Sequence, residues 1–334
     1  MLELPVSLRE VCEEMKEERR KTILVIDGNN LSYRQSVVSE LHTSTGIATS
    51  VIYSILKGLT SFINKFDAFN FVICWDTHRS RRRLALFPGY KSGRRKERTP
   101  EEQEWYTGFI AQIQMTRKVL DFLKIPQVSV DHVEADDLMA LLGGILSKKF
   151  EVILVSTDKD LLQCVVPNVS VYNPFKKKLF TYENCLETIG LTAEQYLFAR
   201  ALMGDGSDSI PGIKGVGEKT AFEMVKTLRI PNLEFLKMFI STCEKKKKVY
   251  DKVVSETALI ERNLKLMRLP MLLSDLDAEE KELVQQKVNA DLLKCILVNR
   301  KMIQQDKFYK LMEKLELYSV LSQSNLELLK IQLI

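Results

Sequence analysis

The stretch that decides the fold is residues 22–27, TILVID, an apolar run that ends on an acid. Two further runs have the same form, FVICWD at residues 71–76 and VILVSTD at residues 152–158, and a shorter run, QVSV, lies at residues 127–130. Near-continuous apolar runs rich in β-branched residues are typical of strands buried on both faces of a parallel sheet. The four runs therefore predict a largely parallel sheet.

Helical patterns separate these strands. From Val51 to Phe66, apolar residues recur at every third or fourth position, which predicts an amphipathic helix. Further helices are expected from Pro100 to about Leu123 and from near Glu134 to Lys148. After about Thr181 the strand signals fade, and helical patterns follow at residues 193–203, 218–228 and 233–240. The alternation predicts an α/β fold, with a central, mostly parallel sheet flanked by helices.

Composition limits the class of protein. The chain has 334 residues, of which 45% are apolar and 28% are charged, so a packed core is expected and a disordered chain is excluded. The longest apolar run, near residues 138–146, is too short for a membrane span, and the start lacks the apolar block of a signal peptide. The six cysteines are far apart in the sequence. We read them as reduced thiols and expect a cytoplasmic protein that does not enter membranes.

Acids follow three of the strands directly. Asp27, Asp76 and Asp158 should share one rim, because the carboxyl ends of parallel strands meet at the same edge of a sheet. Further acids follow nearby patterns, namely Glu134, Asp136, Asp137, Asp160, Asp205 and Asp208. Each acid alone could cap a helix or occupy a turn. Converging carboxylates repel one another unless a cation neutralises them, so a metal site is the better interpretation of the whole set.

The ligand types indicate which metal. No histidine or cysteine accompanies the acids, and an all-oxygen set favours Mg²⁺ or Mn²⁺ over zinc. Two such ions roughly 3.5–4 Å apart can hold the attacking and the leaving oxygen of a phosphoryl displacement. The acidic pattern therefore predicts chemistry on phosphodiesters.

A basic segment begins next to Asp76. Residues 77–98 contain a single acid, Glu97, and a series of cations, which are Arg79, Arg81, Arg82, Arg83, Lys91, Arg94, Arg95, Lys96 and Arg98. Most such runs are solvated loops. Here aromatic residues are interleaved or adjacent, namely Phe87, Tyr90 and Trp105. Cations attract phosphates and aromatic faces stack on unpaired bases, so the segment favours nucleic-acid binding.

A glycine-rich turn follows the last acids. Residues 212–221 read GIKGVGEKTA and overlap at Gly212 with GDGSDSIPG at residues 204–212. Such a turn could be a simple helix connector. Glycines also allow a close backbone approach, and a helix beginning near Glu218 would direct free amides toward a phosphate. We interpret the turn as a non-specific contact to a duplex backbone, carried by Gly212, Lys214, Gly215, Gly217, Lys219 and Thr220.

Taken in order, the motifs resemble the 5′-nuclease (flap endonuclease) family, most closely the bacteriophage 5′-3′ exonucleases and the 5′-nuclease domain of bacterial DNA polymerase I. The resemblance covers about residues 21–226 and rests on ILVIDGNNLSYR, WDTHRSRRRLALFPGYKSGR, HVEADDLMA, STDKDLLQ, MGDGSDSIPG and GIKGVGEKTA. It implies a PIN-like nuclease core with a basic helical arch at residues 77–104 and a helix–three-turn–helix motif at about residues 203–228. We expect an N-terminal helix at residues 1–20, the core at residues 21–180 and a helical region at residues 181–334.

The resemblance also implies roles. The first metal would be bound by Asp27, Asp76, Glu134 and Asp136, with Asp137 close by, and the second by Asp158, Asp160, Asp205 and Asp208. Lys91 would stabilise the scissile phosphate, assisted by Arg83. Tyr33 would stack on the terminal base pair. Other DNA contacts would come from the glycine-rich turn, which in several members holds a K⁺ ion, and from Arg81, Arg82, Arg94 and Arg95.

The expected function is therefore that of an Mg²⁺-dependent, structure-specific 5′ nuclease with two ions, in which Mn²⁺ can substitute. Its substrates would be DNA with 5′ flaps or 5′ ends and RNA–DNA hybrids, in replication or repair. We expect a monomer, in a bacterial host cytoplasm if the chain is phage-encoded. The alternatives are a catalytically silent module that binds branched DNA and a small-molecule phosphatase. Ser209 departs from the family pattern, which usually has Asn there, and no motif is recognised beyond about residue 250.

Overall fold

The computed structural model describes residues 21–38, 41–94, 98–228, 232–241, 247–270, 276–297 and residue 314. The expected N-terminal helix at residues 1–20 and the predicted DNA contact Arg95 lie outside these ranges. No helix among the described residues is long and apolar enough to cross a membrane. The four cysteines in the described part carry no disulfide bond.

The centre of the molecule is a six-stranded sheet with the order β3-β2-β1-β4-β5-β6. Its strands are β1 (Thr22–Asp27), β2 (Ala68–Cys74), β3 (Gln127–Val128), β4 (Glu151–Val155), β5 (Val169–Asn173) and β6 (Lys178–Phe180). All neighbours pair in parallel except β6, which runs antiparallel to β5. The strand order reverses between β1 and β4, so a switch point lies at their carboxyl ends. The predicted mostly parallel sheet is confirmed.

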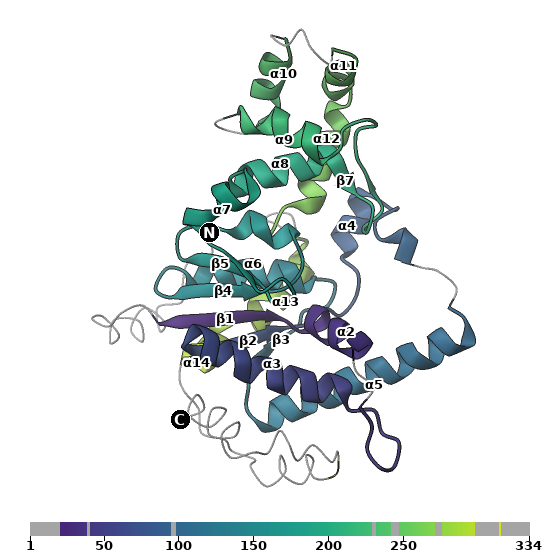
Figure 1. Cartoon of the computed structure of the whole chain (residues 1–334), viewed down its shortest axis with the longest axis vertical. Helices are drawn as coiled ribbons and strands as arrows, with labels where there is room; N and C mark the ends of the chain where they lie inside the picture. Colours follow the sequence, from purple (N-terminus) through teal and green to yellow (C-terminus); the bar gives the residue numbers. More distant parts are fainter. Residues whose placement is uncertain are drawn as a thin grey trace.

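Helices cover both faces of this sheet (Figure 1). In chain order the helices of the first half are α2 (Gly28–Val38), α3 (Ser50–Phe66), α4 (Arg81–Leu86), the short η1 (Ser92–Arg94), α5 (Pro100–Phe122), α6 (Ala135–Leu146) and the short η2 (Asp160–Cys164). Those of the second half are α7 (Tyr182–Ile189), α8 (Ala193–Met203), α9 (Glu218–Lys226), α10 (Leu233–Ser241), α11 (Lys247–Ser255), α12 (Thr257–Met267), α13 (Ala278–Lys287) and α14 (Ala290–Leu297).

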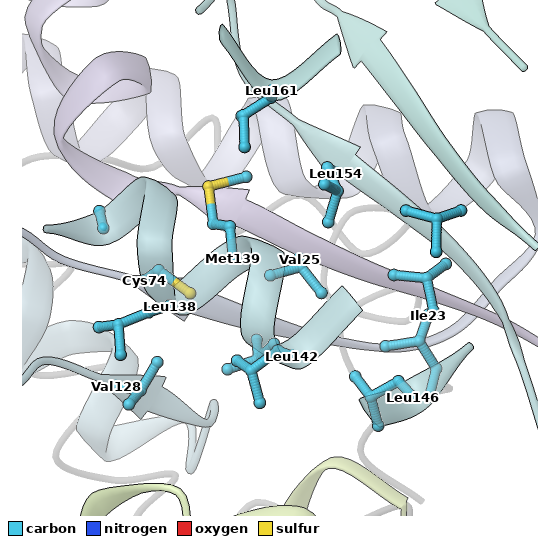
Figure 2. Packing of buried hydrophobic residues seen from close by; sticks show 14 of the residues in the cluster. Ile23, Val25, Cys74, Val128, Leu138, Met139, Leu142, Leu146, Leu154 and Leu161 are labelled. Atoms are coloured by element: carbon cyan, nitrogen blue, oxygen red, sulfur yellow. The ribbon is translucent and has the colours of Figure 1, made fainter. Parts of the chain in front are cut away.

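Strand β1 shows why the sheet is buried on both faces. Ile23 and Val25 belong to the core that α6, α13 and α14 cover, whereas Leu24 and Ile26 belong to the core under α3 and α5. All four side chains are fully buried. Figure 2 shows the α6 side of this core, where Met139 and its helical neighbours pack over the sheet. This packing fixes the ends of the parallel strands, which carry the acids.

A second, helical core lies above the sheet in Figure 1, around α8, α9, α10, α11 and α12. The turn between α8 and α9 contains a small hairpin of β7 (Gly204–Asp205) and β8 (Ile210–Pro211). The Asn263 side-chain amide of α12 donates to the carbonyls of Ala201 and Pro211, both at 2.9 Å. Helix α12 thereby fixes the end of α8 and the hairpin.

The structure differs from the expectation in its shorter strands. The sequence does not reveal β5 and β6, and the predicted strand at residues 127–130 is only two residues long because Val130 turns to form an isolated bridge with Val133. The sequence pattern also does not predict β7 and β8, which lie after Thr181 and have two residues each.

Candidate active site

Asp27 is the last residue of β1 and lies at the switch point. Its carboxylate accepts hydrogen bonds from the Asn30 amide and the Ser156 hydroxyl, both at 2.9 Å. Asp27 is only 8% exposed, and burial together with the charges of Asp76 and Asp158 raises its pKa to about 7. The acids that follow β1, β2 and β4 are therefore close enough to repel one another.

Two asparagines connect the loops around Asp27, and the sequence reasoning missed both. The Asn29 side-chain oxygen accepts from the Asp76 amide at 2.9 Å. The Asn30 side-chain oxygen accepts from the amide and the hydroxyl of Thr157, at 3.1 and 2.8 Å. The signal that could have found them is their position: two polar amides directly after a strand that ends on an acid.

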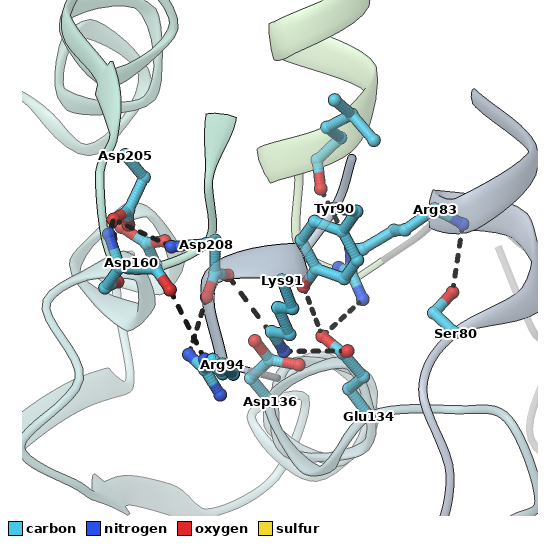
Figure 3. Close-up of polar contacts among 12 residues, drawn as sticks. Ser80, Arg83, Tyr90, Lys91, Arg94, Glu134, Asp136, Asp160, Asp205 and Asp208 are labelled. Atoms are coloured by element: carbon cyan, nitrogen blue, oxygen red, sulfur yellow. Dashed lines mark hydrogen bonds and ion pairs between the residues drawn. The ribbon is translucent and has the colours of Figure 1, made fainter. Parts of the chain in front are cut away.

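Glu134, the residue before α6, is where the basic segment meets the acids (Figure 3). It is 4% exposed and receives the Lys91 ammonium at 2.7 Å and the Tyr90 hydroxyl at 2.8 Å. Burial alone would raise the pKa of Glu134, but the charges of Arg83 and Lys91 hold it below the ordinary value. Lys91 thus lies directly over the acidic rim, as an anion-binding cation would.

The two neighbouring acids have different surroundings. Asp76 accepts a hydrogen bond from the Ala135 amide at 2.7 Å, so it caps the first turn of α6 while remaining at the rim. Burial and the charge of Asp137 raise the pKa of Asp136 well above its ordinary value. Such a carboxyl gains most from a cation that would offset its charge.

Arg83 and Asp137 form an internal ion pair. Two guanidinium nitrogens of Arg83 contact the two carboxylate oxygens of Asp137 at 2.5 and 3.0 Å, and the first also donates to Glu134 at 3.1 Å. The Arg83 Nε donates to the Leu266 carbonyl of α12 at 2.9 Å. Arg83 is 2% exposed and Asp137 is 4% exposed. These contacts give both residues a structural role; their predicted parts in phosphate and metal binding stay predictions.

The acids beyond β4 are held by an arginine that the sequence reasoning did not single out. Arg200 of α8 donates to Asp160 at 2.8 Å and to Asp205. Asp158 lies alongside, where its carboxylate accepts the Asp160 amide at 2.8 Å. Burial raises the pKa of Asp160 to about 6, although the Arg200 charge opposes this rise. A cation in a largely apolar helix just before MGDGSD is the signal that could have found Arg200.

Asp208 lies on the β7–β8 turn, next to the basic segment (Figure 3). Its carboxylate contacts the Arg94 guanidinium at 2.5 Å and lies 4.0 Å from the Lys91 ammonium. The structure therefore brings Asp208 to the same cation that holds Glu134. The predicted DNA contact Arg94 is, in this arrangement, bound to an acid.

The donor chemistry fits hard divalent cations. The pKa values of Asp27, Asp136 and Asp160 are all raised, and the neighbouring carboxylates that contribute to this include Asp76 and Asp158 at Asp27, Asp137 at Asp136 and Asp158 at Asp160. As they stand, no three His, Cys, Asp or Glu side chains among the described residues are arranged to hold an ion. Lys91, Arg94 and Arg200 instead contact the carboxylates. A bound ion would have to exchange with some of these contacts.

The predicted DNA contacts occupy two surfaces. Tyr33 of α2 is 55% exposed, with its ring 6.0 Å from that of Trp105, which is itself 40% exposed. Arg81 and Arg82 lie on α4, where Arg81 forms an exposed ion pair with Glu279 at 3.5 Å. Tyr33 therefore lies beside α5, and Arg81 lies beside α13.

The glycine-rich turn is built on two buried anchors, Ile213 and Val216. Between and beside them, Lys214, Gly215, Gly217 and Lys219 are exposed, and Thr220 is half-buried. Gly215 has a φ of +94°, which favours glycine. At Gly212, a Cβ would lie 1.8 Å from the Met203 carbonyl oxygen, so only glycine fits there. The turn thus presents lysines and backbone to the outside, as a phosphate contact requires.

Two family models match consecutive parts of the chain. Residues 22–190 match the 5′-3′ exonuclease N-terminal resolvase-like domain, and residues 191–291 match the 5′-3′ exonuclease C-terminal SAM fold. The chain belongs to the 5′-3′ exonuclease family, and it is a nuclease.

Individual relatives agree with this assignment. A 5′-3′ exonuclease of Aquifex aeolicus is 35% identical over 208 residues, which are 62% of this chain and 69% of the relative. DNA polymerase I of Bacillus subtilis is 34% identical over 213 residues, but the match spans only 23% of that protein. Among solved structures, the bacteriophage T5 D15 flap endonuclease, in a complex with DNA and metal ions, has the same fold (TM-score 0.71, 22% identity, 83% of this chain and 99% of that chain).

Proposed function

We propose that this chain is a divalent-metal-dependent, structure-specific 5′ nuclease that hydrolyses phosphodiesters in DNA bearing 5′ flaps or 5′ ends. The observation that carries the proposal is the position of Lys91, which contacts Glu134 at 2.7 Å and lies 4.0 Å from Asp208. A cation over a rim of carboxylates can receive a phosphate there while metals occupy the acids. The description of the Aquifex relative as a 5′-3′ exonuclease supports the proposed polarity.

The proposed cofactor is a pair of Mg²⁺ ions, for which Mn²⁺ can substitute. Asp27, Asp76, Glu134 and Asp136 would hold one ion, and Asp158, Asp160, Asp205 and Asp208 the other. Bound there, the ions would lower the pKa of a water molecule and offset charge on the departing oxygen. The chain's own part is to orient the phosphate through Lys91 and to keep the first ligand loops in place through Asn29 and Asn30.

The proposed substrate contacts lie on both sides of this rim. Tyr33 would stack on the terminal base pair, and residues 77–104 would form an arch over the single-stranded 5′ end. Lys214 and Lys219 would contact duplex phosphates, with K⁺ bound at the same turn. We further propose that RNA–DNA hybrids are substrates, that the protein is a monomer acting in replication or repair, and that the nuclease core ends near residue 180.

The test is cleavage of 5′-labelled flap DNA with Mg²⁺, with Mn²⁺ and with EDTA, followed by sizing of the products. We expect metal-dependent cutting near the flap junction and short products from recessed 5′ ends. Cutting that continues in EDTA would contradict the metal mechanism. Tight DNA binding without cutting would indicate a binding module, and hydrolysis of small phosphate esters alone would indicate a phosphatase.

A Lys91→Ala variant tests the residue that carries the proposal. Its single-turnover rate on flap DNA should fall at least about tenfold, the equivalent of about 1.4 kcal/mol of transition-state stabilisation. Lys214→Ala is the matched control, because it removes a lysine from the turn and should change DNA affinity rather than the rate at saturation. An unchanged rate in Lys91→Ala would remove Lys91 from the mechanism.

A further inference from the structure

Residues 91–94 of the basic segment are hydrogen-bonded to the β7–β8 turn. The Lys91 amide donates to the Asp208 carbonyl at 2.8 Å, and the Gly93 amide donates to the Ser209 hydroxyl oxygen at 3.0 Å. Arg94 adds a bond to the Ser207 carbonyl at 3.3 Å and its ion pair with Asp208. We refer to these contacts, between residues 91–94 and residues 207–209, as the latch.

The latch combines two kinds of contact. The Arg94–Asp208 pair of the latch is ionic, as is the Lys91–Glu134 pair beside it, so a divalent cation competes for the carboxylates and a phosphate competes for the side-chain cations. The bonds from the Lys91 and Gly93 amides are neutral and join backbone to backbone or backbone to hydroxyl. A metal ion that binds the carboxylates does not need the Asp208 carbonyl or the Ser209 hydroxyl, which accept from those two amides. The neutral bonds can therefore persist while the ionic contacts exchange.

The local backbone is shaped for this contact. Ser209 has a φ of +59° and Lys91 a φ of +54°, values that are uncommon for residues other than glycine. Such conformations persist where the surroundings impose them, often at functional sites. A Cβ on Gly93 would lie 3.1 Å from the Ser209 hydroxyl oxygen, so the two strands of chain approach closely. Tyr90 and Ile210, which directly precede Lys91 and follow Ser209 in the chain, are buried in one apolar cluster.

We propose that Ser209 is a positioning residue for cleavage: its hydroxyl holds the backbone of residues 91–93 over the acidic rim, so that Lys91 stays within reach of the phosphate when the ionic contacts exchange. This inference rests on the proposed function, because it assumes that Lys91 acts on a phosphate. It gives a role to the position at which the sequence departs from the family pattern.

Three variants separate the hydroxyl from the backbone conformation. Ser209→Gly suits the positive φ but lacks the acceptor, and Ser209→Ala lacks the acceptor while keeping the Cβ. Ser209→Asn tolerates the positive φ and supplies a side-chain oxygen. If the latch acts through its acceptor, the glycine and alanine variants should share one defect and the asparagine variant should restore the wild-type behaviour.

Two readouts are needed. Without metal or DNA, trypsin should cut after Arg94 or Arg98 about five- to tenfold faster in Ser209→Gly than in wild type, because cleavage follows the population of the opened segment. On flap DNA with Mg²⁺, the single-turnover rate of Ser209→Gly should fall about tenfold while DNA affinity measured in EDTA is unchanged. Thermal unfolding should show that Ser209→Gly remains fully folded at the assay temperature, which separates positioning from global unfolding.

The outcomes are distinguishable. Wild-type proteolysis and cleavage rates in Ser209→Gly would overturn the inference, as would a defect that Ser209→Asn fails to restore. If wild type cuts no DNA but trypsin still shows the expected difference, the latch holds and the proposed function fails. If wild type cuts DNA and the variants do not differ from it in either readout, the proposed function holds and the latch fails.

Discussion

At the scale of single residues, the most consequential pair is Arg83 with Asp137, which is internal and nearly inaccessible to water. Removing two charges from water is costly. The two hydrogen bonds between Arg83 and Asp137 offset that cost, together with those that Arg83 donates to Glu134 and to the Leu266 carbonyl. The pair joins α4, α6 and α12, so it fixes the start of the basic segment relative to Glu134.

An Arg83→Met variant should lower the free energy of unfolding by about 3 kcal/mol, because it leaves the Asp137 carboxylate buried without its partner. The double variant Arg83→Met/Asp137→Leu should recover most of that loss, since neither charge then remains. Urea denaturation of wild type, both single variants and the double variant measures the coupling. Additive losses would show that the pair does not act as a unit.

Asp27 predicts a pH dependence of the metal-free protein. Its folded-state pKa of about 7 lies above that of the unfolded chain, so the folded state retains a proton that the unfolded state has released. The contribution of Asp27 to the free energy of unfolding should therefore be highest below about pH 4 and should decline as the pH rises toward 7. In EDTA, Asp27→Asn should be more stable than wild type by on the order of 2 kcal/mol near pH 8, and equal to it near pH 4. Urea denaturation at both pH values is the measurement; equal stability at both would contradict it.

Which site residues the sequence reveals follows from distance along the chain. Asp27 and Asp158 are predictable because each follows an apolar strand, and strand ends meet in parallel sheets. Arg200 cannot be predicted in this way, because its partner Asp160 is forty positions away and no local sequence pattern indicates that the two residues pair. The resemblance does name Arg83, but it does not reveal the ion pair with Asp137, which lies fifty-four positions further along the chain. Charge pairing depends on the finished fold.

At the scale of elements, strands with continuous apolar runs are predictable and short edge strands are not. Strand β1 extends one residue beyond the apolar run 22–26, and β4 begins and ends one residue earlier than the apolar run 152–156. In contrast, β5 reads VSVYN, with polar residues at two of its five positions, and β6 reads KLF at the edge of the sheet. Pairing with a neighbour, rather than composition, makes these segments strands.

The glycine-rich turn offers an element-scale prediction. Gly212→Ala should destabilise the protein by about 2 kcal/mol or more, because the added Cβ would lie 1.8 Å from the Met203 carbonyl oxygen and the turn would have to move. Gly217→Ala is the control, since a Cβ there meets nothing within 4 Å and its φ is −94°. Thermal unfolding of both variants gives the comparison. Equal midpoints would mean that the turn can shift without cost.

At the scale of the whole molecule, the strand order brings the acids proposed as metal ligands together from both halves of the sheet. The chain proceeds from β1 to β2 and β3 on one side and then to β4 and β5 on the other, so the acids meet only after the sheet is complete. Metal binding should therefore report on the entire fold rather than on one segment.

Added Mg²⁺ should raise the unfolding midpoint of the metal-free protein near pH 8, because the ion binds the folded state only. At an Mg²⁺ concentration a hundred times the dissociation constant, the free energy of unfolding should increase by about 2.7 kcal/mol. The rise should shrink near pH 5, where raised pKa values leave Asp27 and Asp160 protonated. EDTA should reverse it. If added Mg²⁺ leaves the unfolding midpoint unchanged at both pH values, the proposed metal ions are contradicted.

Helix α12 sets a lower limit on how far the protein can be shortened. Leu266 anchors Arg83, Met267 receives the Gln163 side chain at 2.8 Å, and Asn263 secures the ends of α8 and β8. A minimal catalytic fragment designed from the motif-bearing stretch alone, ending near residue 226, would discard all three anchors. Engineers seeking a smaller enzyme should keep the polypeptide at least through Met267.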